Sequence, residues 1–357
     1  MIESVFQDPP EGYPMFSGLF DTQTRLAKID RNGDPLKRMN ELVDWSIFWP
    51  ELSAFAEVAN PSKGGRPPVC PLLKFKMLVL QSLYNLSDDG LEQQVLDRLS
   101  FMRFLGLGLG DDVPDAKTIW FFRETLKEHG LTEKLFARFG EFLNHAGFAA
   151  RQGQIVDATI VKVPIRRDSR ETNDKVKKEE PVEEWTPNQR AQKDVDARWT
   201  QKNGKSFFGY KNHADVDVGH KLIRAYEVTP ASVHDSNVFE TLLTENSDPS
   251  VYADSAYMSE ERVARMTAPD SPWLPCIHEK GHAKHPLSES QRTANRERSR
   301  HRVRVEHVFG TQWQMSGKQL LRGIGIARAR VKIGLRNLAY NLARYATLVF
   351  GNRSIVF

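Results

Sequence analysis

The stretch GQIVDATIVKVP, residues 153–164, sets the fold class, because it alternates in polarity and is rich in β-branched residues. These features are typical of a β-strand with one buried face. Two similar segments follow, KSFFGYKNHADVDVG at 205–219 and LIRAYEVTPA at 222–231, and Gly219 marks the turn between them. We therefore expect this part of the chain to open with three antiparallel strands.

Beyond these strands, the sequence alternates between helical and strand patterns. In chain order, we expect a helix at 234–245, a strand at 250–257, a helix at 260–267, a strand at 272–281, a basic helix at 288–316 and a closing helix at 329–350. The core side of the closing helix is predicted to be Val331, Leu335, Leu338, Leu342 and Tyr345. This is an α/β order. A ribonuclease-H-like core would show it, although periodicity alone suits other α/β arrangements equally well.

The first half of the chain is predicted to be helical. Residues 66–148 form an all-helical unit in which Asp115 is an expected N-cap. This unit is either a helix-turn-helix reader of DNA or a dimerising bundle, and the sequence does not choose between them. Residues 1–65 show few clear periods and are expected to form an N-terminal arm. The third region, 149–357, is the α/β domain, with a polar excursion at about 166–198 that we expect to be disordered or loosely helical.

Composition excludes several classes of protein. With 40% hydrophobic and 27% charged residues, the chain is typical of a globular protein with a sizeable core. Cys70 and Cys276 are far apart and suggest neither a disulfide framework nor a zinc site, as expected in a reducing cytosol. The first residues do not resemble a signal peptide, and the most apolar stretch, 78–86, is too short to cross a bilayer. We expect a cytoplasmic protein with no membrane partner.

The distribution of charge is more informative than the net charge of +4. From 290 to 353 the only acids are Glu297 and Glu306, against more than a dozen Arg and Lys residues. So one-sided a segment indicates a polyanion partner, with a solvated basic face as the plainer alternative.

Three acidic residues are candidates for metal ligands. Asp157 lies within a predicted strand, where a carboxylate is unfavourable unless a partner or metal meets it. Asp254 ends a strand, where α/β sheets usually build ligand sites. Glu306 shares a helix face with Arg302. Carboxylates suit Mg²⁺, and two such ions about 3.5–4 Å apart can stabilise both oxygens of a phosphoryl displacement. Singly, each acid has an ordinary explanation: a turn cap, a strand-end residue and an ion pair with Arg302.

Five stretches carry a resemblance to a known family, in the family's order over about 65–350. They are IVDATIV (155–161), DVDARWTQKNGKSFFGYKNHADVD (194–217), LIRAYEVTPASVHDSNVF (222–239), VYADSAYMS (251–259) and RVRVEHVFG (302–310). With these stretches the chain resembles the transposases of bacterial insertion sequences, specifically the insertion-sequence-five group of DDE transposases.

The resemblance implies a ribonuclease-H-like catalytic domain whose DDE triad is Asp157, Asp254 and Glu306. It implies two Mg²⁺ ions per site, with Mn²⁺ as a substitute. The partners it implies are double-stranded DNA, as terminal inverted repeats and target, and a second copy of the chain, since paired ends favour a two-fold dimer. Arg302 matches the arginine that the family carries before its last acid. Ser299 and Trp313 replace the tyrosine and lysine of the wider signature.

Basic and aromatic side chains gather in three regions suited to phosphates and bases. They are the hairpin WTQKNGKSFFGYKNHADVD at 199–217, the basic helix, and the closing helix, where basic residues recur every four positions. The predicted DNA-binding residues are Lys205, Tyr210, Lys211 and His213 in the hairpin, Arg300, Arg302, Arg304 and Lys318 in and after the basic helix, and Arg328, Lys332 and Arg336 in the closing helix. Asp235 is assigned to a helix N-cap. His278 is assigned to a DNA-backbone contact or a solvated loop.

The expected reaction is cleavage of the element's ends, followed by attack of the freed 3′-hydroxyls on target DNA. Two other functions stay open. One is a catalytically silent DNA-binding protein descended from a transposase. The other is a nuclease of the same fold that never joins strands.

Overall fold

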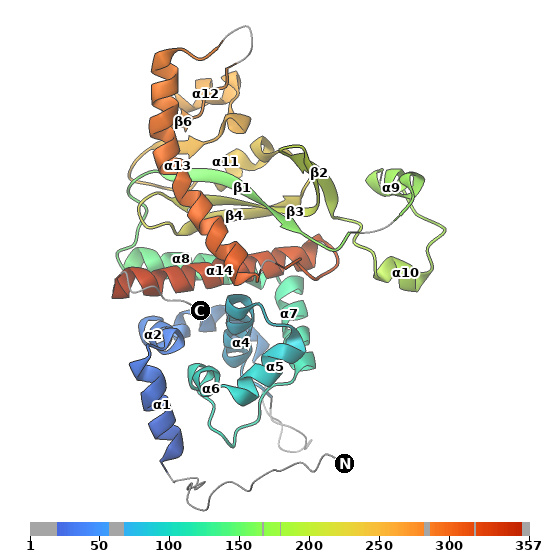
Figure 1. Ribbon diagram of the computed structural model, residues 1–357, viewed down its shortest axis with the longest axis vertical. Helices are drawn as coiled ribbons and strands as arrows, with labels where there is room; N and C mark the ends of the chain where they lie inside the picture. The colour runs from blue at the N-terminus through green and yellow to red at the C-terminus, as the bar shows by residue number, and fades with distance from the viewer. Residues whose placement is uncertain are drawn as a thin grey trace, which may run out of the picture.

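A computed structural model describes residues 20–56, 68–165, 168–178, 180–281, 286–317 and 319–351. Figure 1 shows three layers: a helical unit, the long helix α14 (Ile326–Phe350), and a mixed sheet crossed by α13 (Glu289–Met315). Helix α14 therefore lies between most of the N-terminal helices and the sheet, while α8 (Leu131–His145) lies beside α14 and contacts β4 through Phe136 and Tyr226.

The helical unit begins earlier than the sequence patterns indicate. Within the stretch predicted as an arm, residues 20–56 form helices whose Leu36, Met39, Phe48 and Leu52 are buried. Asp115 accepts a hydrogen bond from the Thr118 amide at 2.7 Å, so the predicted N-cap is confirmed. The helices of this unit are α1 (Asp21–Arg31), α2 (Pro35–Leu42), η1 (Trp45–Phe48), α3 (Trp49–Leu52), η2 (Ser53–Phe55), α4 (Pro71–Tyr84), α5 (Asp88–Asp97), α6 (Leu99–Leu105), α7 (Ala116–Glu128) and α8 (Leu131–His145).

The sheet has the predicted antiparallel opening. Strand β3 (Lys205–Asp217) pairs antiparallel with β1 (Gln154–Lys162) and with β4 (Ile223–Pro230). On its other side, β1 pairs parallel with β5 (Ser250–Ala253), which pairs parallel with β6 (Leu274–Ile277). The α/β class and the ribonuclease-H-like order of strands are confirmed.

A short hairpin extends the sheet. Strand β2 (Arg198–Lys202) pairs with the start of β3 through the turn at Asn203 and Gly204. Gly209, where this pairing meets β1, has a φ of 153°, and a Cβ there would lie 2.2 Å from the Val161 carbonyl oxygen. Only glycine permits so close an approach of the two strands.

The closing helix is buried on several sides. All five predicted core residues of α14 are buried, and so are Ile333, Ala339 and Tyr340 on other sides of the helix. One hydrophobic cluster runs from the N-terminal helices through α14 to β1, β3 and α13. A helix buried on several sides belongs to the interior of a large core.

The remaining helices are short. The polar excursion contains two of them, α9 (Arg170–Lys177) and α10 (Pro187–Ala191), which Figure 1 shows set apart from the sheet. Val176 and Val182 are buried there, so at least part of this segment is packed. Between the strands lie η4 (Asp235–Val238), α11 (Phe239–Leu242), η5 (Ser255–Tyr257) and α12 (Glu260–Met266).

Candidate active site

Two of the three predicted acids lie close together in the sheet, Asp157 within β1 and Asp254 directly after the neighbouring parallel strand β5. Ile155 of β1 pairs with Tyr252 of β5, and two residues further along the chain from each come Asp157 and Asp254. Asp254 also begins η5, because its Oδ1 accepts a hydrogen bond from the Ala256 amide at 2.8 Å. The register of the sheet thus brings these two carboxylates together.

Asp157 is the more enclosed of the pair. Its Oδ1 accepts a hydrogen bond from the Ala158 amide at 2.8 Å, and its Oδ2 accepts one from Arg302 Nη2 at 3.3 Å. Burial raises the pKa of Asp157, the negative charge of Asp254 raises it further, and the charges of Arg302 and Lys202 lower it. A carboxylate in this position is incompletely compensated, as expected of a site that binds a cation.

Glu306 does not complete this cluster. It lies on α13 four residues beyond Arg302 and is exposed. Four residues of an α-helix turn the chain through about 400°, so Glu306 points about 40° away from the direction of Arg302. Among the described residues, no group of three Asp, Glu, His or Cys side chains is arranged to hold a metal ion. The paired oxygen donors of Asp157 and Asp254 suit a hard divalent cation, and the third ligand is not in place.

His278 supports Arg302. Arg302 Nη1 lies 3.1 Å from His278 Nδ1, and His278 Nε2 lies 3.1 Å from the Asn295 carbonyl oxygen. Arg302 donates to Nδ1, so the proton of the neutral ring sits on Nε2. Burial lowers the pKa of His278, and the charge of Arg302 lowers it further, which favours this neutral form. The structure therefore assigns His278 to holding Arg302 against Asp157.

A fourth acid, Asp235, faces the same region. Burial raises the pKa of Tyr257 well above its usual range, and the charges of Asp157, Asp235 and Asp254 add to the effect. The Tyr257 hydroxyl is buried and has no hydrogen-bond partner within the described ranges. Asp235 accepts a hydrogen bond from Lys211 Nζ at 2.7 Å. It is not the helix cap that we predicted, since His234 caps η4.

Comparison with known families identifies the class of protein. A family model described as a transposase DDE domain matches residues 149–342, which include all three predicted acids. The chain belongs to the DDE transposase family. A second model, described as Transposase domain (DUF772), matches residues 23–125. Together the two domains are typical of bacterial insertion-sequence transposases, as the resemblance predicted, and the protein is a metal-dependent enzyme that acts on DNA.

A solved structure gives a more distant match. It is the cryo-EM structure of the piggyBac transposase synaptic complex with hairpin DNA, which has a TM-score of 0.41 and 13% sequence identity. The match covers 91% of this chain and 77% of that one. None of the transposase helices within the described residues is long and apolar enough to cross a membrane.

Three of the four DNA contacts predicted in the hairpin are buried in the transposase. Tyr210 donates its hydroxyl hydrogen to Asp194 at 2.7 Å, Lys211 bonds to Asp235, and His213 Nε2 lies 2.8 Å from Thr229 Oγ1. We correct these assignments, because β3 lies between β1 and β4 and this part of it is covered on both faces. Only Lys205 is exposed.

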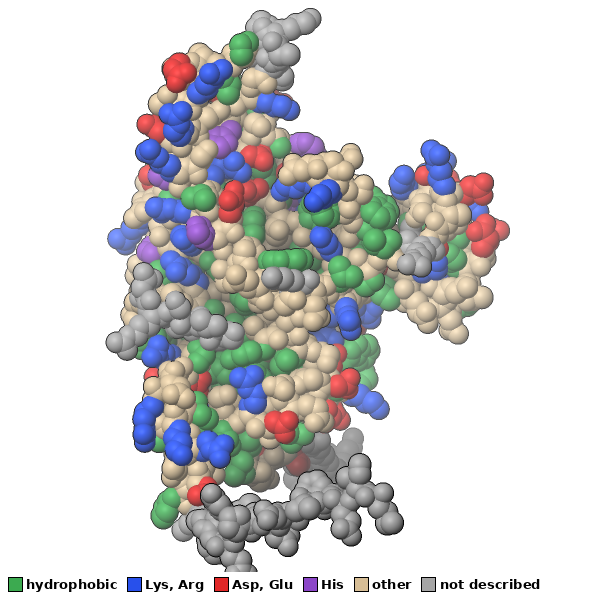
Figure 2. Space-filling model, in the orientation of Figure 1, with side chains coloured by type: hydrophobic (Ala, Val, Ile, Leu, Met, Phe, Trp, Pro, Cys, Tyr) green, Lys and Arg blue, Asp and Glu red, His purple; other side chains and the backbone are tan. Residues whose placement is uncertain are grey.

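The basic helix α13 presents two different faces. Arg298 and Arg302 point toward the sheet, where Arg298 Nη1 donates to the Ile277 carbonyl oxygen at 2.9 Å. On another face Arg292, Arg296 and Arg300 are exposed at four-residue spacing. Figure 2 shows Lys and Arg side chains along the length of α13. Arg304 continues this spacing and donates a hydrogen bond to the Val218 carbonyl oxygen.

The three DNA contacts predicted in α14 face the helical unit. Arg328 forms a two-pronged pair with Glu124 of α7, at 2.7 and 2.9 Å. Lys332 and Arg336 are partly buried beside a cavity. Lys318 lies outside the described residues.

Sequence reasoning missed two lysines near the site. The charge of Lys202 lowers the pKa of Asp157 although the two residues are 45 positions apart in sequence. The β2–β3 hairpin brings them near each other. Trp313 stands at the position where the wider signature has a lysine, and Lys162 Nζ lies 5.8 Å from the centre of its ring. A cation thus lies beside that position, supplied by β1 instead of α13.

Proposed function

We propose that this transposase binds the terminal inverted repeats of its insertion element, cleaves the DNA ends and joins their 3′-hydroxyls to target DNA. The observation that carries the proposal is the placement of Asp157 in β1 beside Asp254, which directly follows the neighbouring strand β5. The proposal is also supported by the presence of Glu306 on α13, inside the segment that matches the DDE transposase model. The reaction would take place on the bacterial nucleoid, in the cytoplasm.

Asp157, Asp254 and Glu306 would hold two Mg²⁺ ions, with Mn²⁺ as a substitute. Bound divalent ions lower the pKa of an attacking water and stabilise the charge that develops on the leaving oxygen. The incomplete compensation of Asp157 supports this assignment, because a nearby cation stabilises the ionised carboxylate.

Hydrogen bonds fix the orientation of two of the three acids. Arg302, held by His278, orients Asp157. The Ala256 amide orients Asp254. Glu306 has no ion pair among the described residues, so it is free to change rotamer when DNA and metal bind.

Strand transfer needs no covalent protein intermediate. After hydrolysis, the freed 3′-hydroxyl replaces water as the nucleophile and attacks a target phosphodiester. Holding both DNA ends in one two-fold assembly raises the effective concentration of this nucleophile. The exposed arginines of α13 would neutralise backbone phosphates and make binding strongly dependent on salt.

One experiment tests this function. The purified protein is incubated with a labelled fragment carrying the element's end and a supercoiled target, with and without Mg²⁺ or Mn²⁺. We expect metal-dependent cleavage at the end, followed by joined product. Nicks without joined product would indicate a nuclease of the same fold.

The position of Glu306 favours one alternative, a catalytically silent DNA-binding protein, because the described residues contain no three-ligand metal cluster. Binding to the element's end without cleavage in either metal would establish that alternative.

A further inference from the structure

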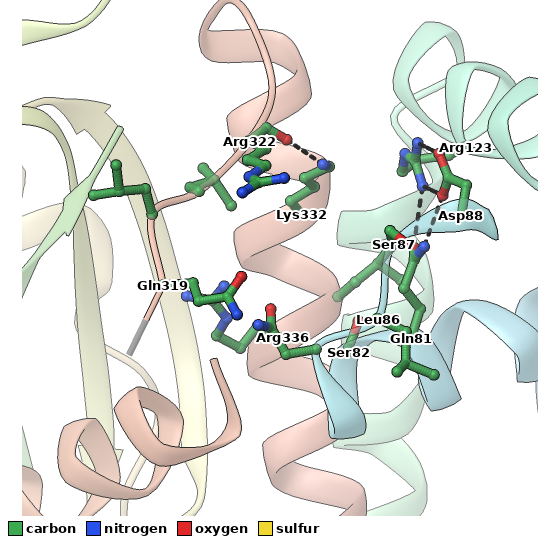
Figure 3. Close-up of a pocket in the computed structure, with 14 residues that line it drawn as sticks. Gln81, Ser82, Leu86, Ser87, Asp88, Arg123, Gln319, Arg322, Lys332 and Arg336 are labelled. Atoms are coloured by element: carbon green, nitrogen blue, oxygen red, sulfur yellow. Dashed lines mark hydrogen bonds and ion pairs between the residues drawn. The ribbon is translucent and has the colours of Figure 1, made fainter. Parts of the chain in front are cut away.

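A cavity of about 270 Å³ lies between the helical unit and α14. Its walls are the connection between α4 and α5, Arg123 of α7, residues 319–322, and one face of α14 (Figure 3). Asp157, Asp254 and Glu306 do not line it. It is therefore separate from the candidate active site.

The lining is strongly cationic. It contains four basic side chains, Arg123, Arg322, Lys332 and Arg336, but a single carboxylate, Asp88. Asp88 is already neutralised, because Arg123 donates to both of its oxygens at 2.7 Å. Three positive side chains therefore share the cavity without a carboxylate of their own among its lining residues.

Arg336 is the least compensated of the three. Within the described residues it forms no hydrogen bond or ion pair, and burial lowers its pKa to about 10. Lys332, four residues earlier on the same face of α14, donates a hydrogen bond to the Arg322 carbonyl oxygen. Burial also lowers the pKa of Lys332, to about 8. An unpaired buried charge is unfavourable unless an opposite charge joins it.

We propose that this cavity binds a phosphate group through Arg336, Lys332 and Arg322. The planar guanidinium of Arg336 can donate two parallel hydrogen bonds to one oxyanion, and Lys332 adds a point charge. Gln319 supplies a neutral donor beside it. A cavity of this size holds many waters, so a phosphate fits together with part of its hydration.

The phosphate has two possible sources, free phosphate and a backbone phosphate of bound DNA. The site does not depend on the cleavage reaction proposed above, because none of the three acids takes part in it. Its test accordingly uses inorganic phosphate in the absence of DNA and metal.

Titration calorimetry with inorganic phosphate, at constant ionic strength, measures the site directly. We expect saturable binding to the wild type and about tenfold weaker binding, or worse, to Arg336→Met, because a charge-assisted pair is lost. Arg330→Met is the matched control, since Arg330 lies exposed on the same helix and pairs with Glu227. It should bind phosphate as the wild type does.

Thermal unfolding separates a binding role from a structural one. Without phosphate, Arg336→Met should melt at a higher temperature than the wild type, because an uncompensated charge is gone. Phosphate should raise the midpoint of the wild type but not that of the variant. If Arg336→Met does not fold, Arg322→Met, whose substituted side chain is exposed, replaces it with the same expected loss of binding. No saturable binding to the wild type, or unchanged binding to the folded variant, would overturn the proposal.

A competition experiment identifies the source. If DNA supplies the phosphate, inorganic phosphate at matched ionic strength weakens DNA binding by the wild type. Arg336→Met then reduces the salt dependence of binding by about one phosphate contact. If the two proteins bind DNA equally in both conditions, the ligand is free phosphate. Either result is compatible with a phosphate-binding site at Arg336 and identifies the source of the phosphate.

Discussion

Arg302 Nη2 donates a hydrogen bond to Asp157 Oδ2 across 3.3 Å, joining α13 to the central strand of the sheet. The arginine supplies a positive charge beside Asp157. Arg302 lies one turn before Glu306 on α13. Its hydrogen bond therefore attaches the helix that carries Glu306 to Asp157.

Asp157 should lower the stability of the folded protein at neutral pH. Its pKa is raised in the folded protein, so its contribution to stability is present below the unfolded pKa and is lost as pH rises through the folded pKa. Asp157→Asn has no carboxyl group to ionise, so the variant does not lose this stability as pH rises. We expect a higher unfolding midpoint at pH 7, measured by differential scanning calorimetry, together with loss of end cleavage and retained DNA binding. Asp270→Asn, on an exposed loop, should change none of these three properties.

Lys202 should contribute to the pH range of the reaction. Its charge lowers the pKa of Asp157, so Lys202→Met should raise that pKa and move the pH of half-maximal cleavage upward. A pH–rate profile under single-turnover conditions measures the shift. Lys205→Met, three residues along the same hairpin, is the control: it should weaken DNA binding and leave the profile unmoved. An identical profile for Lys202→Met would refute the assignment.

A buried acid outside the triad should control stability between pH 4 and 8. Burial raises the pKa of Asp215 to about 8, and its Oδ1 has no hydrogen-bond partner among the described residues. Its folded pKa lies above the unfolded value, so wild-type stability should fall as pH rises from about 4 to about 8 and level off above that range. Asp215→Asn should flatten this dependence by at least about 1 kcal/mol, since one pKa unit corresponds to about 1.4 kcal/mol. Denaturant unfolding at a series of pH values gives the answer, and parallel curves for the two proteins would contradict it.

The pair between Glu124 and Arg328 should contribute to docking of the helical unit on α14. Arg328, followed by Lys127, holds the pKa of Glu124 down at about 2. Its contribution is therefore present above the unfolded pKa and lost as pH falls toward 2. Glu124→Gln should lower the free energy of unfolding by about 1 kcal/mol at pH 7 and by little near pH 2. Glu128→Gln, exposed at the end of the same helix, is the comparison.

Much of the fold follows from local pattern. The basic helix predicted at 288–316 is found at Glu289–Met315, and the five core positions predicted for α14 are all buried. Periodicity reports which side of a helix is apolar, and that information is local in sequence. It does not report that α14 is covered on several sides, because this depends on what packs against it.

The candidate site was less accessible to sequence reasoning. Lys211 and His213 are basic residues of the kind found on protein surfaces. They are buried because β3 lies between two other strands. Lys332 and Arg336 are spaced four residues apart, as on an exposed helix face. In the structure this face of α14 is directed toward the helical unit. The charge of Lys202 affects the pKa of Asp157 only because the β2–β3 hairpin brings the two residues near each other. These relationships join residues that are distant in sequence, so no local pattern contains them.

The central claim is that Asp157, Asp254 and Glu306 bind the catalytic metal, and a change of metal preference tests it most directly. Each acid is replaced singly by cysteine, and cleavage of the element's end is measured in Mg²⁺ and in Mn²⁺. Thiolate is a poor ligand for Mg²⁺ and a better one for softer ions, so all three variants should be inactive in Mg²⁺ and regain cleavage in Mn²⁺. Glu297→Cys, exposed on the same helix as Glu306, should cleave in both metals. Normal cleavage in Mg²⁺ by any of the three variants would contradict the assignment of that residue as a metal ligand.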